Sequence, residues 1–428
     1  MSSGKRSSHP VSVGTAQFSN DGGSVSVRAL DGVTVVDLTQ IVSGAVTSMM
    51  LADFGAEVIK VEPVGGETYR KAGYELHGPG GSTNLNILRF TRGKKSVELD
   101  LKSERGKEIL AELVTQADVL VENFRPGVLA RLGFSWERLH ELNPRLVYTS
   151  ISGFGHDDVL PSPHRDQPAY AIIAEAMAGL THLAGEKDRP PAWMGFAMSD
   201  IFSGTCAFAG TLVALRDRDR TGEGTRVDIG MFDACLLMND LPMAYQEHLG
   251  ESMGRGQYAL QSPWGPFEAS DGYLIIAVLN PREWAALCGC IGRPDLVDHP
   301  DLATGHMRSK AHETIVRPAI EEWTSVRTRG QAVAELQAAR VPSAPVNTTE
   351  DLLDDEQITA RQMRQDTTNR DLGTIRTIGN PIKVASSLVG QEPTALPALG
   401  EHTDEVLRTR LGLDDTEIAA LRESKVVG

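Results

Sequence analysis

Residues 31–62 read DGVTVVDLTQIVSGAVTSMMLADFGAEVIKVE and decide the class of fold. Residues 33–38 form a short apolar run that predicts a buried strand. The apolar stretch that follows has a helical pattern and ends at Gly55, and residues 58–62 predict a second strand. A strand, a helix and a strand within about thirty residues form a βαβ unit, and its crossover implies a parallel sheet.

The same alternation continues along the chain. Residues 96–100 are extended, Ser103 is placed to cap a helix through Ala117, and strands follow at 118–122 and 146–151. The sequence therefore predicts an α/β fold with a doubly wound sheet of the Rossmann type. Neither G-x-G-x-x-G nor G-x-x-x-x-G-K-[ST] occurs, so this fold class does not imply a dinucleotide or ATP.

The composition narrows the possible functions. The chain has 428 residues, which suggests two domains, and 41% hydrophobic with 23% charged residues is typical of a globular protein. The net charge of −15 argues against nucleic acid and anionic membranes as partners. The longest apolar candidate, residues 201–215, is too short to cross a membrane, and residues 1–28 read as a flexible extension without a secretory signal.

Four cysteines, at 206, 235, 288 and 290, are too few for a disulfide framework and favour a reducing cytoplasm. Cys288 and Cys290 form a C-x-C pair, but no second pair or nearby histidine completes a metal site. We therefore expect buried or half-buried thiols and no metal.

One region opposes the acidic balance of the chain. Between Arg89 and Lys107, seven basic residues face three acids, a local charge of +4. A ligand with several phosphates would explain the cluster, but a solvated charged surface explains it as well.

Two further positions have both a structural and a chemical interpretation. Asp200 precedes an apolar helix, where an aspartate is usually an N-cap, but a helix start would also stabilise a nucleophilic carboxylate. Asn123 and Arg125 follow a strand, where they form either an ordinary turn or a phosphate site at the carboxyl edge of the sheet.

Several ordered blocks resemble the class III coenzyme A transferases. They are residues 31–63, residues 93–155, TGEGTRVDIGMFDA at 221–234 and LGEHTDEVL at 399–407. The resemblance implies a homodimer of two interlocked rings. It also implies a large Rossmann-like domain from residues 29–224 and 331–428, with a small α+β domain at 225–330.

The resemblance further implies an activity and a site. Such enzymes move CoA from an acyl-CoA to a free carboxylic acid through an aspartyl anhydride and an aspartyl-CoA thioester, with CoA as substrate and no permanently bound cofactor. The family nucleophile falls on Asp200, at the end of the G-x-x-x-x-D stretch 195–200. The family's CoA contacts fall on Val42, Ser43, Leu99, Lys102, Asn123, Phe124, Arg125 and Arg131.

Some positions depart from the family pattern. Gln40 and Ala45 stand where histidine and proline are frequent, and Pro63 replaces a basic residue for which Arg70 or Lys71 would substitute. Residues 253–266 replace the glycine-rich loop of formyl-CoA transferases, which argues against oxalate as acceptor.

The sequence leaves two alternatives to a CoA-transferase open. α-Methylacyl-CoA racemase, a divergent branch of the family, needs a histidine where Tyr170 stands, and His156 and His164 are out of register. A non-catalytic CoA-binding subunit would not need Asp200. An acyl pocket is a further open question, because its candidates serve equally well as core residues: Trp193, Met194, Met238 and Trp264.

Overall fold

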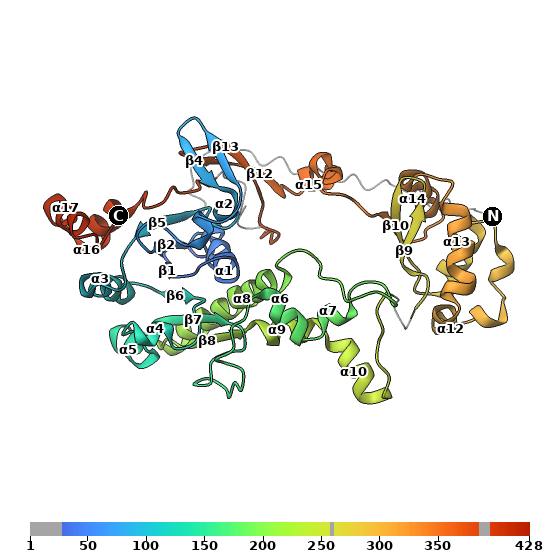
Figure 1. Ribbon diagram of the computed structural model, residues 1–428, viewed down its shortest axis with the longest axis horizontal. Helices are drawn as coiled ribbons and strands as arrows, with labels where there is room; N and C mark the ends of the chain where they lie inside the picture. Colours follow the sequence, from blue (N-terminus) through green and yellow to red (C-terminus); the bar gives the residue numbers. More distant parts are fainter. Residues whose placement is uncertain (1–27, 257–260, 385–393) are drawn as a thin grey trace, which may run out of the picture.

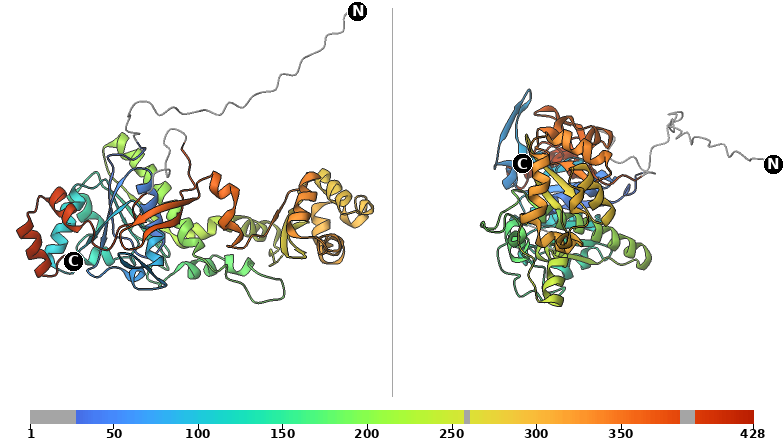
Figure 2. Two further views of the ribbon diagram at one scale, coloured as in Figure 1. Left: turned by 90° about the horizontal axis from the view of Figure 1, so that it is seen from above. Right: turned by 90° about the vertical axis from the view of Figure 1, so that its right-hand side faces the viewer.

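The computed structural model describes residues 28–256, 261–384 and 394–428, which form two bodies at opposite ends of a long axis (Figures 1 and 2). The chain leaves the larger body through α10 (Asp240–Leu249) and the residues that follow it. It returns from the smaller body through the segment that carries α15 (Glu356–Ala360).

A six-stranded parallel sheet lies at the centre of the larger body, in the order β5-β2-β1-β6-β7-β8. Its strands are β1 (Thr34–Asp37), β2 (Glu57–Glu62), β5 (Lys94–Glu98), β6 (Val119–Glu122), β7 (Val147–Ser152) and β8 (Arg226–Gly230). In chain order this is 3-2-1-4-5-6, the order of a doubly wound sheet that reverses direction between β1 and β6. The predicted α/β fold with a parallel sheet is confirmed.

Helices cover both faces of this sheet. Val36 of β1 faces a core shared with α3 (Glu104–Thr115), α5 (Trp136–Leu142), α16 (Thr403–Leu411) and α17 (Asp415–Glu423). Its neighbour Val35 faces α1 (Ser43–Asp53) and α8 (Met198–Thr221) on the other side. Because both faces are buried, the strand is a continuous apolar run rather than an alternating one. The predicted cap of α3 is confirmed, since the Ser103 side chain accepts a hydrogen bond from the Gly106 amide.

Helix α8 is longer than residues 201–215. Among the described residues it is the one helix that is long and apolar enough to cross a membrane by length and composition. It packs so closely on α1 that a Cβ on Gly204 would lie 2.3 Å from the Ser43 carbonyl oxygen, and Thr211 contacts Thr149 of β7 at 2.8 Å. These contacts make it a core helix. One face of this apolar helix is nevertheless open to solvent, since Val213 is 71% exposed.

The smaller body has its own sheet and core. The strands are β9 (Trp264–Ala269), β10 (Gly272–Ala277) and β11 (Ser343–Pro345), and core residues between 267 and 341 pack against them. They come mainly from α11 (Pro281–Cys290), α13 (Arg317–Thr324) and α14 (Arg329–Ala338). Strand β11 and most of α14 lie beyond residue 330, where the small domain is expected to end.

Two polar hairpins were not expected from the sequence. They are β3 (Glu75–Gly78) with β4 (Gly81–Asn84), and β12 (Arg364–Asn369) with β13 (Gly373–Ile378). The Gly80 amide donates to the Asp371 carbonyl at 2.9 Å, so the two hairpin turns touch. The remaining α-helices are α2 (Leu85–Leu88), α4 (Val128–Arg131), α6 (Ala171–Met177), α7 (Leu180–Leu183), α9 (Met231–Met238) and α12 (Gly305–Lys310).

All four cysteines are free, two buried and two half-buried, as expected from the sequence.

Candidate active site

The candidate site lies where the sheet reverses direction, at the carboxyl ends of β1 and β6. The Asn123 side chain ties the two loops together. Its oxygen accepts from the Gln40 amide at 2.8 Å, and its nitrogen donates to the Gln40 carbonyl at 2.8 Å and to the Ser43 hydroxyl at 3.1 Å. The loop that begins α1 is therefore held in one position relative to the loop after β6.

A cavity of about 170 Å³ opens beside these loops and reaches the start of α8. Its lining includes Asp200 and five of the eight expected CoA contacts: Val42, Ser43, Asn123, Phe124 and Arg125. The fold thus brings together residues that are up to 158 positions apart, from 42 to 200.

The other three expected contacts do not line this cavity. Leu99 is a core residue with 1% of its surface exposed. Lys102 and Arg131 are exposed, the first beyond the carboxyl end of β5 and the second at the end of α4. Both residues follow the carboxyl ends of strands of the parallel sheet, β5 and β6, and lie outside the lining of this cavity.

Asp200 does not cap α8. The N-cap of this helix is Ala197, and the buried Glu175 of α6 accepts a hydrogen bond from the Ser199 amide at 3.1 Å. The interpretation of Asp200 as an N-cap is therefore wrong, because another carboxylate already serves the amides of the first turn. No described residue donates a hydrogen bond to the Asp200 side chain.

The surroundings of Asp200 favour its protonated form. Burial raises its pKa, the negative charge of Glu175 raises it further, and the positive charge of Arg89 lowers it, so that the pKa is about 6. Tyr69 faces the same group of charges, and burial raises the pKa of its hydroxyl. Sequence patterns gave no signal for Glu175 or Tyr69, since neither belongs to a motif.

The loop before α1 has a strained backbone, and two buried charged side chains hold it in place. Ile41 has a φ of +66°, which for a β-branched residue costs about 1–3 kcal/mol. The Ile41 amide donates to the buried Glu67 carboxylate at 2.7 Å. Lys60, also buried, pairs with Glu67 at 3.0 Å and donates to the Thr39 carbonyl at 2.7 Å. These contacts fix the backbone that leads into the cavity.

The basic cluster between Arg89 and Lys107 does not form one phosphate patch. Five of its seven cations are paired with acids: Arg92 with Asp53, Lys94 with Asp37, Lys95 with Glu57 and Glu405, Arg105 with Glu108 and Glu112, and Lys107 with Glu104. Within the part of the chain that the structure describes, Arg89 and Lys102 form no such ion pair.

Arg70 and Lys71, the two candidates to replace a basic residue at Pro63, differ in whether their charge is free to bind a ligand. Arg70 binds Glu62 through two hydrogen bonds of 2.7 and 2.6 Å, so its charge is already compensated. Lys71 is exposed and has no ion pair among the described residues.

The histidines near the site are occupied elsewhere. Nδ1 of His156 lies 2.7 Å from Asp228 in a buried pair; burial lowers the pKa of His156, but the contact with Asp228 raises it overall. His164 bonds to Gln167 and packs its ring against Phe154. Neither lines the cavity that holds Asp200, whereas Tyr170 does.

None of the four acyl-pocket candidates lines this cavity. Trp193 and Met194 are exposed before α8, Met238 ends α9, and Trp264 begins β9 in the smaller body. Among residues 28–256, 261–384 and 394–428, no group of three or more histidine, cysteine, aspartate or glutamate side chains is placed to hold a metal ion.

The fold and the cavity define an α/β protein with a half-buried carboxylate at the ligand-binding edge of a parallel sheet. The chain belongs to CoA-transferase family III, whose model matches residues 30–403, and is thereby an enzyme of the CoA-transferase class.

Relatives with assigned names support this membership. The chain is 34% identical to a formyl-CoA:oxalate CoA-transferase from Streptomyces coelicolor, over 94% of this chain and 100% of that protein. It is 35% identical to a succinyl-CoA:mesaconate CoA-transferase from Haloarcula hispanica, over 89% of this chain and 96% of the relative. A crystal structure of a CAIB/BAIF family protein from Brucella suis has 32% sequence identity and a TM-score of 0.78, and the match covers 90% of this chain and 100% of that one.

Proposed function

We propose that this enzyme transfers CoA between two carboxylic acids and that Asp200 carries the groups in turn. An Asp200 oxygen attacks the thioester carbonyl of the donor, a C–O bond forms, the C–S bond breaks and CoA leaves as thiolate. The thiolate attacks the aspartyl carbonyl, which releases the donor acid and leaves an aspartyl-CoA thioester. The acceptor carboxylate then expels the thiolate to form a second anhydride. Attack of the thiolate on the acceptor carbonyl restores Asp200 and gives the new acyl-CoA.

The observation that carries this proposal is the position of Asp200. Its carboxylate accepts no hydrogen bond from a described residue, lies in a cavity and has a pKa of about 6, so at neutral pH it is mostly ionised but weakly solvated. The scheme has no net proton transfer or redox change, and it keeps the thioester energy.

The start of α1 supplies a place for the negative charge that develops on the attacked carbonyl. No side chain of the described residues caps this helix, and its N-terminal residues Val42 and Ser43 line the same cavity as Asp200. The first amides of a helix lack partners within it and are suited to an oxyanion. We therefore assign oxyanion stabilisation to the first turn of α1.

CoA binding would extend from this cavity along the edge of the sheet. Asn123, Phe124 and Arg125 stand beside Asp200, and Lys102 and Arg131 are exposed cations further out. The resemblance assigns CoA contacts to these residues and to Leu99, whose burial leaves only backbone or van der Waals contact. Held by its remote nucleotide, the thiolate would stay close to the aspartyl group at high effective concentration.

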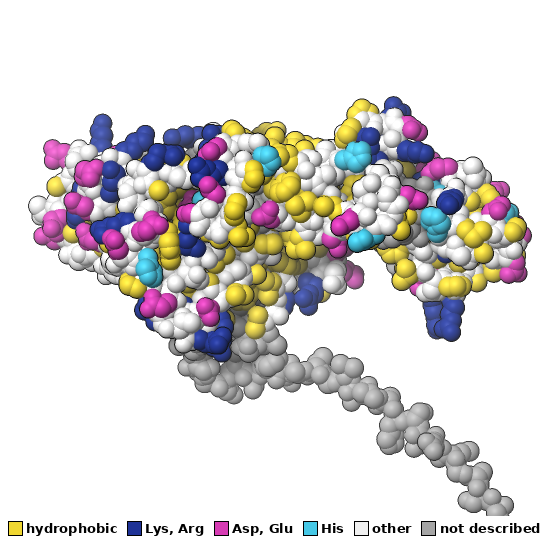
Figure 3. Space-filling model, turned by 90° about the horizontal axis from the view of Figure 1, so that it is seen from below, with side chains coloured by type: hydrophobic (Ala, Val, Ile, Leu, Met, Phe, Trp, Pro, Cys, Tyr) yellow, Lys and Arg dark blue, Asp and Glu magenta, His cyan; other side chains and the backbone are white. Residues whose placement is uncertain are grey.

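A homodimer, in the interlocked form that the resemblance implies, is part of the proposal. Hydrophobic side chains gather on the middle of one face of the molecule (Figure 3), on the side where α6, α9 and α10 lie in Figure 1. Exposed large apolar residues on these helices are Ile172, Ile173, Met177, Leu237, Leu241 and Met243. Apolar surface gathered in this way is typical of a protein interface. We expect the enzyme to act in the cytoplasm, which suits four free thiols.

The two alternatives have less support. Racemisation needs a base at the α-carbon, and among the described residues that line the Asp200 cavity there is no histidine. A non-catalytic subunit would gain nothing from a carboxylate with a raised pKa in the cavity that Val42 and Ser43, at the start of α1, also line.

Trapping separates these possibilities. The enzyme is incubated with acetyl-, octanoyl- or benzoyl-CoA and then with borohydride or hydroxylamine, and Asp200 is examined by mass spectrometry. We expect modification of Asp200 and loss of activity, with no modification in Asp200→Asn. Unmodified Asp200 in an enzyme that still exchanges CoA between acids would refute the mechanism.

A further inference from the structure

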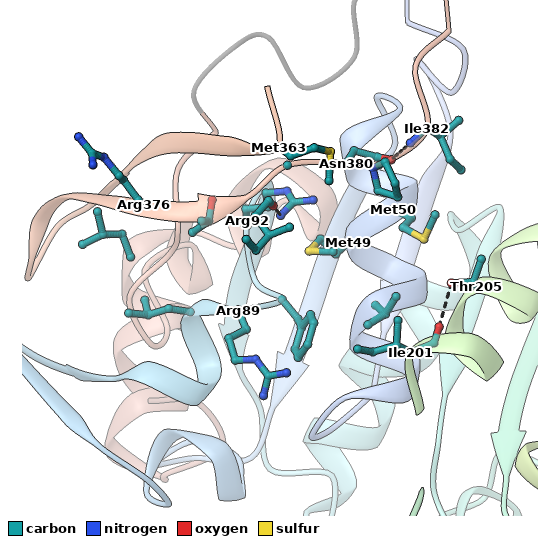
Figure 4. Close-up of a pocket in the computed structure, with 18 of the residues that line it drawn as sticks. Met49, Met50, Arg89, Arg92, Ile201, Thr205, Met363, Arg376, Asn380 and Ile382 are labelled. Carbon is teal, nitrogen blue, oxygen red and sulfur yellow. Dashed lines mark hydrogen bonds between the residues drawn. The ribbon is translucent and has the colours of Figure 1, made fainter. Parts of the chain in front are cut away.

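A second cavity, larger than the first, lies between α1, the start of α8 and β13 (Figure 4). Its volume is about 460 Å³, within the range of small-molecule sites. Met49 and Met50 of α1, Ile201 of α8, and Met363 and Asn380 near the second hairpin surround it. Most of its lining is apolar, and α2 and β13 supply further walls.

This cavity adjoins the nucleophile. Ile201 directly follows Asp200 in the first turn of α8, so the two side chains leave the same turn toward different cavities. Arg89 lines the larger cavity, and its positive charge acts on Asp200, which lines the smaller one. The positive charge of Arg89 therefore lies between the larger cavity and Asp200.

Arg89 differs from the two other arginines that line this cavity, Arg92 and Arg376, because both of those pair with acids; Arg376 lies 3.2 Å from Asp366. Arg92 is buried and binds both oxygens of Asp53, at 2.8 and 2.7 Å, so its charge is already compensated within the protein. Arg89 is exposed, stacks on Phe90 at 4.6 Å from the ring centroid, and forms no ion pair with a described acid. Its guanidinium is available to a ligand carboxylate that approaches Asp200.

From this arrangement, and on the basis of the proposed transfer reaction, we infer that the larger cavity receives the apolar body of the acid while Arg89 holds its carboxylate near Asp200. The substrate class is then monocarboxylic acids with an extended apolar chain or an aromatic ring. A short diacid would place its second carboxylate in a mostly apolar cavity whose other arginines, Arg92 and Arg376, are already paired with acids, and burial of an unpaired charge is unfavourable. A segment of a second copy of this chain is the competing occupant.

Two variants test the inference in the full-length enzyme. Ile378→Trp fills the cavity from β13, where the side chain is 69% exposed and a larger residue leaves the core intact. Arg89→Gln removes the charge, and Arg89→Lys restores it. Val326→Trp and Arg138→Gln, both at exposed positions outside the two cavities, are the matched controls.

Transfer is measured by mass spectrometry of new acyl-CoA, with acetate, butyrate, octanoate, benzoate, oxalate and succinate as acceptors. We expect kcat/KM for octanoate or benzoate to exceed that for acetate and oxalate at least about tenfold. Ile378→Trp should abolish that preference while acetate stays within about twofold. Arg89→Gln should raise KM about tenfold for every monocarboxylate, and Arg89→Lys should recover part of it.

Trapping of Asp200 by an acyl-CoA, measured in parallel, separates the two levels of the proposal. If Asp200 is trapped but oxalate or succinate is preferred, or Ile378→Trp leaves the preference unchanged, this inference is wrong and the mechanism stands. If Ile378→Trp changes the oligomeric state and not the acid preference, the cavity is covered by a second copy and the inference is again wrong. If no acyl-CoA modifies Asp200, the proposed mechanism fails as well.

Discussion

Replacing Glu175 by Gln should shift the acid limb of the pH–rate profile to lower pH. The profile is that of the first chemical step, in which Asp200 attacks the acyl-CoA. The carboxylate of Glu175 is buried and its negative charge raises the pKa of Asp200. Glutamine keeps the shape, and its carbonyl oxygen still accepts from the Ser199 amide, a bond of 3.1 Å in the native chain. The change thus removes charge from the neighbourhood of the nucleophile without leaving the helix start uncapped.

The size of the pH effect follows from the pKa of about 6. The nucleophile is the ionised form, so about half of Asp200 is competent at pH 6, about nine-tenths at pH 7 and about one-tenth at pH 5. Below pH 6 the rate of acylation should fall about tenfold per pH unit. In Glu175→Gln the midpoint lies at lower pH, and in Arg89→Gln at higher pH, because Arg89 lowers the pKa of Asp200.

A single-turnover assay measures this step alone. Excess enzyme is mixed with octanoyl-CoA from pH 4.5 to 8, and release of the CoA thiol is followed. The phosphates of CoA also titrate in this range, but they are the same for every variant, so the displacement between variants reports the carboxylate. Identical midpoints in the native enzyme and both variants, with unchanged thermal unfolding temperatures, would refute the electrostatic reasoning.

Three further predictions concern the frame around the site. Asn123→Leu should raise KM for acyl-CoA about tenfold in steady-state kinetics, because it removes three hydrogen bonds to the loop before α1; an unchanged KM would show that the loop holds itself. Lys60→Met leaves Glu67 buried and unpaired and should lower the free energy of unfolding in urea by about 3–5 kcal/mol, whereas Lys95→Met, at a half-exposed pair, should cost less than about 1 kcal/mol; equal losses would contradict this account. Ser103→Ala should cost about 1 kcal/mol in the same titration and leave kcat unchanged, and a drop in kcat would show that the cap of α3 affects the site.

The central sheet was predictable because its signals are local. Strands β1, β2, β6 and β7 are rich in valine, isoleucine and leucine and are buried on both faces, and Gly55 and Ser103 mark helix ends within the same segments. The order of the strands follows from right-handed crossovers of short βαβ units. The hairpins β3–β4 and β12–β13 had no such signal, since stretches such as GSTN and RQDTTN lack apolar alternation, and the contact between the two hairpins joins residues 288 positions apart.

The site was predictable only in part, for a related reason. The resemblance located Asp200, and the fold placed Asn123 and Ser43 beside it in one cavity. The charge of the basic cluster could not decide between a phosphate patch and a charged surface, because most of its acidic partners lie far along the chain, such as Asp37 and Asp53. Glu175, whose negative charge raises the pKa of Asp200, and Tyr69, whose hydroxyl is affected by the charge of Asp200, become its neighbours only in three dimensions.

A comparison of two aspartates explains why we propose Asp200 rather than Asp37 as the nucleophile. Burial by itself raises the pKa of Asp37, but Lys94, Lys60 and the hydroxyls of Thr39 and Ser48 outweigh burial and bring the pKa to about 2. Every oxygen of that carboxylate is engaged by hydrogen bonds or an ion pair, so its lone pairs are unavailable to a substrate. Asp200 has the opposite environment, with an acid nearby and no donor among the described side chains. A carboxylate that the protein stabilises this little can form a covalent bond at small cost, because no hydrogen bond must first break. The loop before α1 is held rigidly by buried hydrogen bonds and ion pairs, whereas the carboxylate of Asp200 has no hydrogen-bond donor among the described residues. The rigid loop positions the cavity, and the proposed reaction takes place at the carboxylate within it.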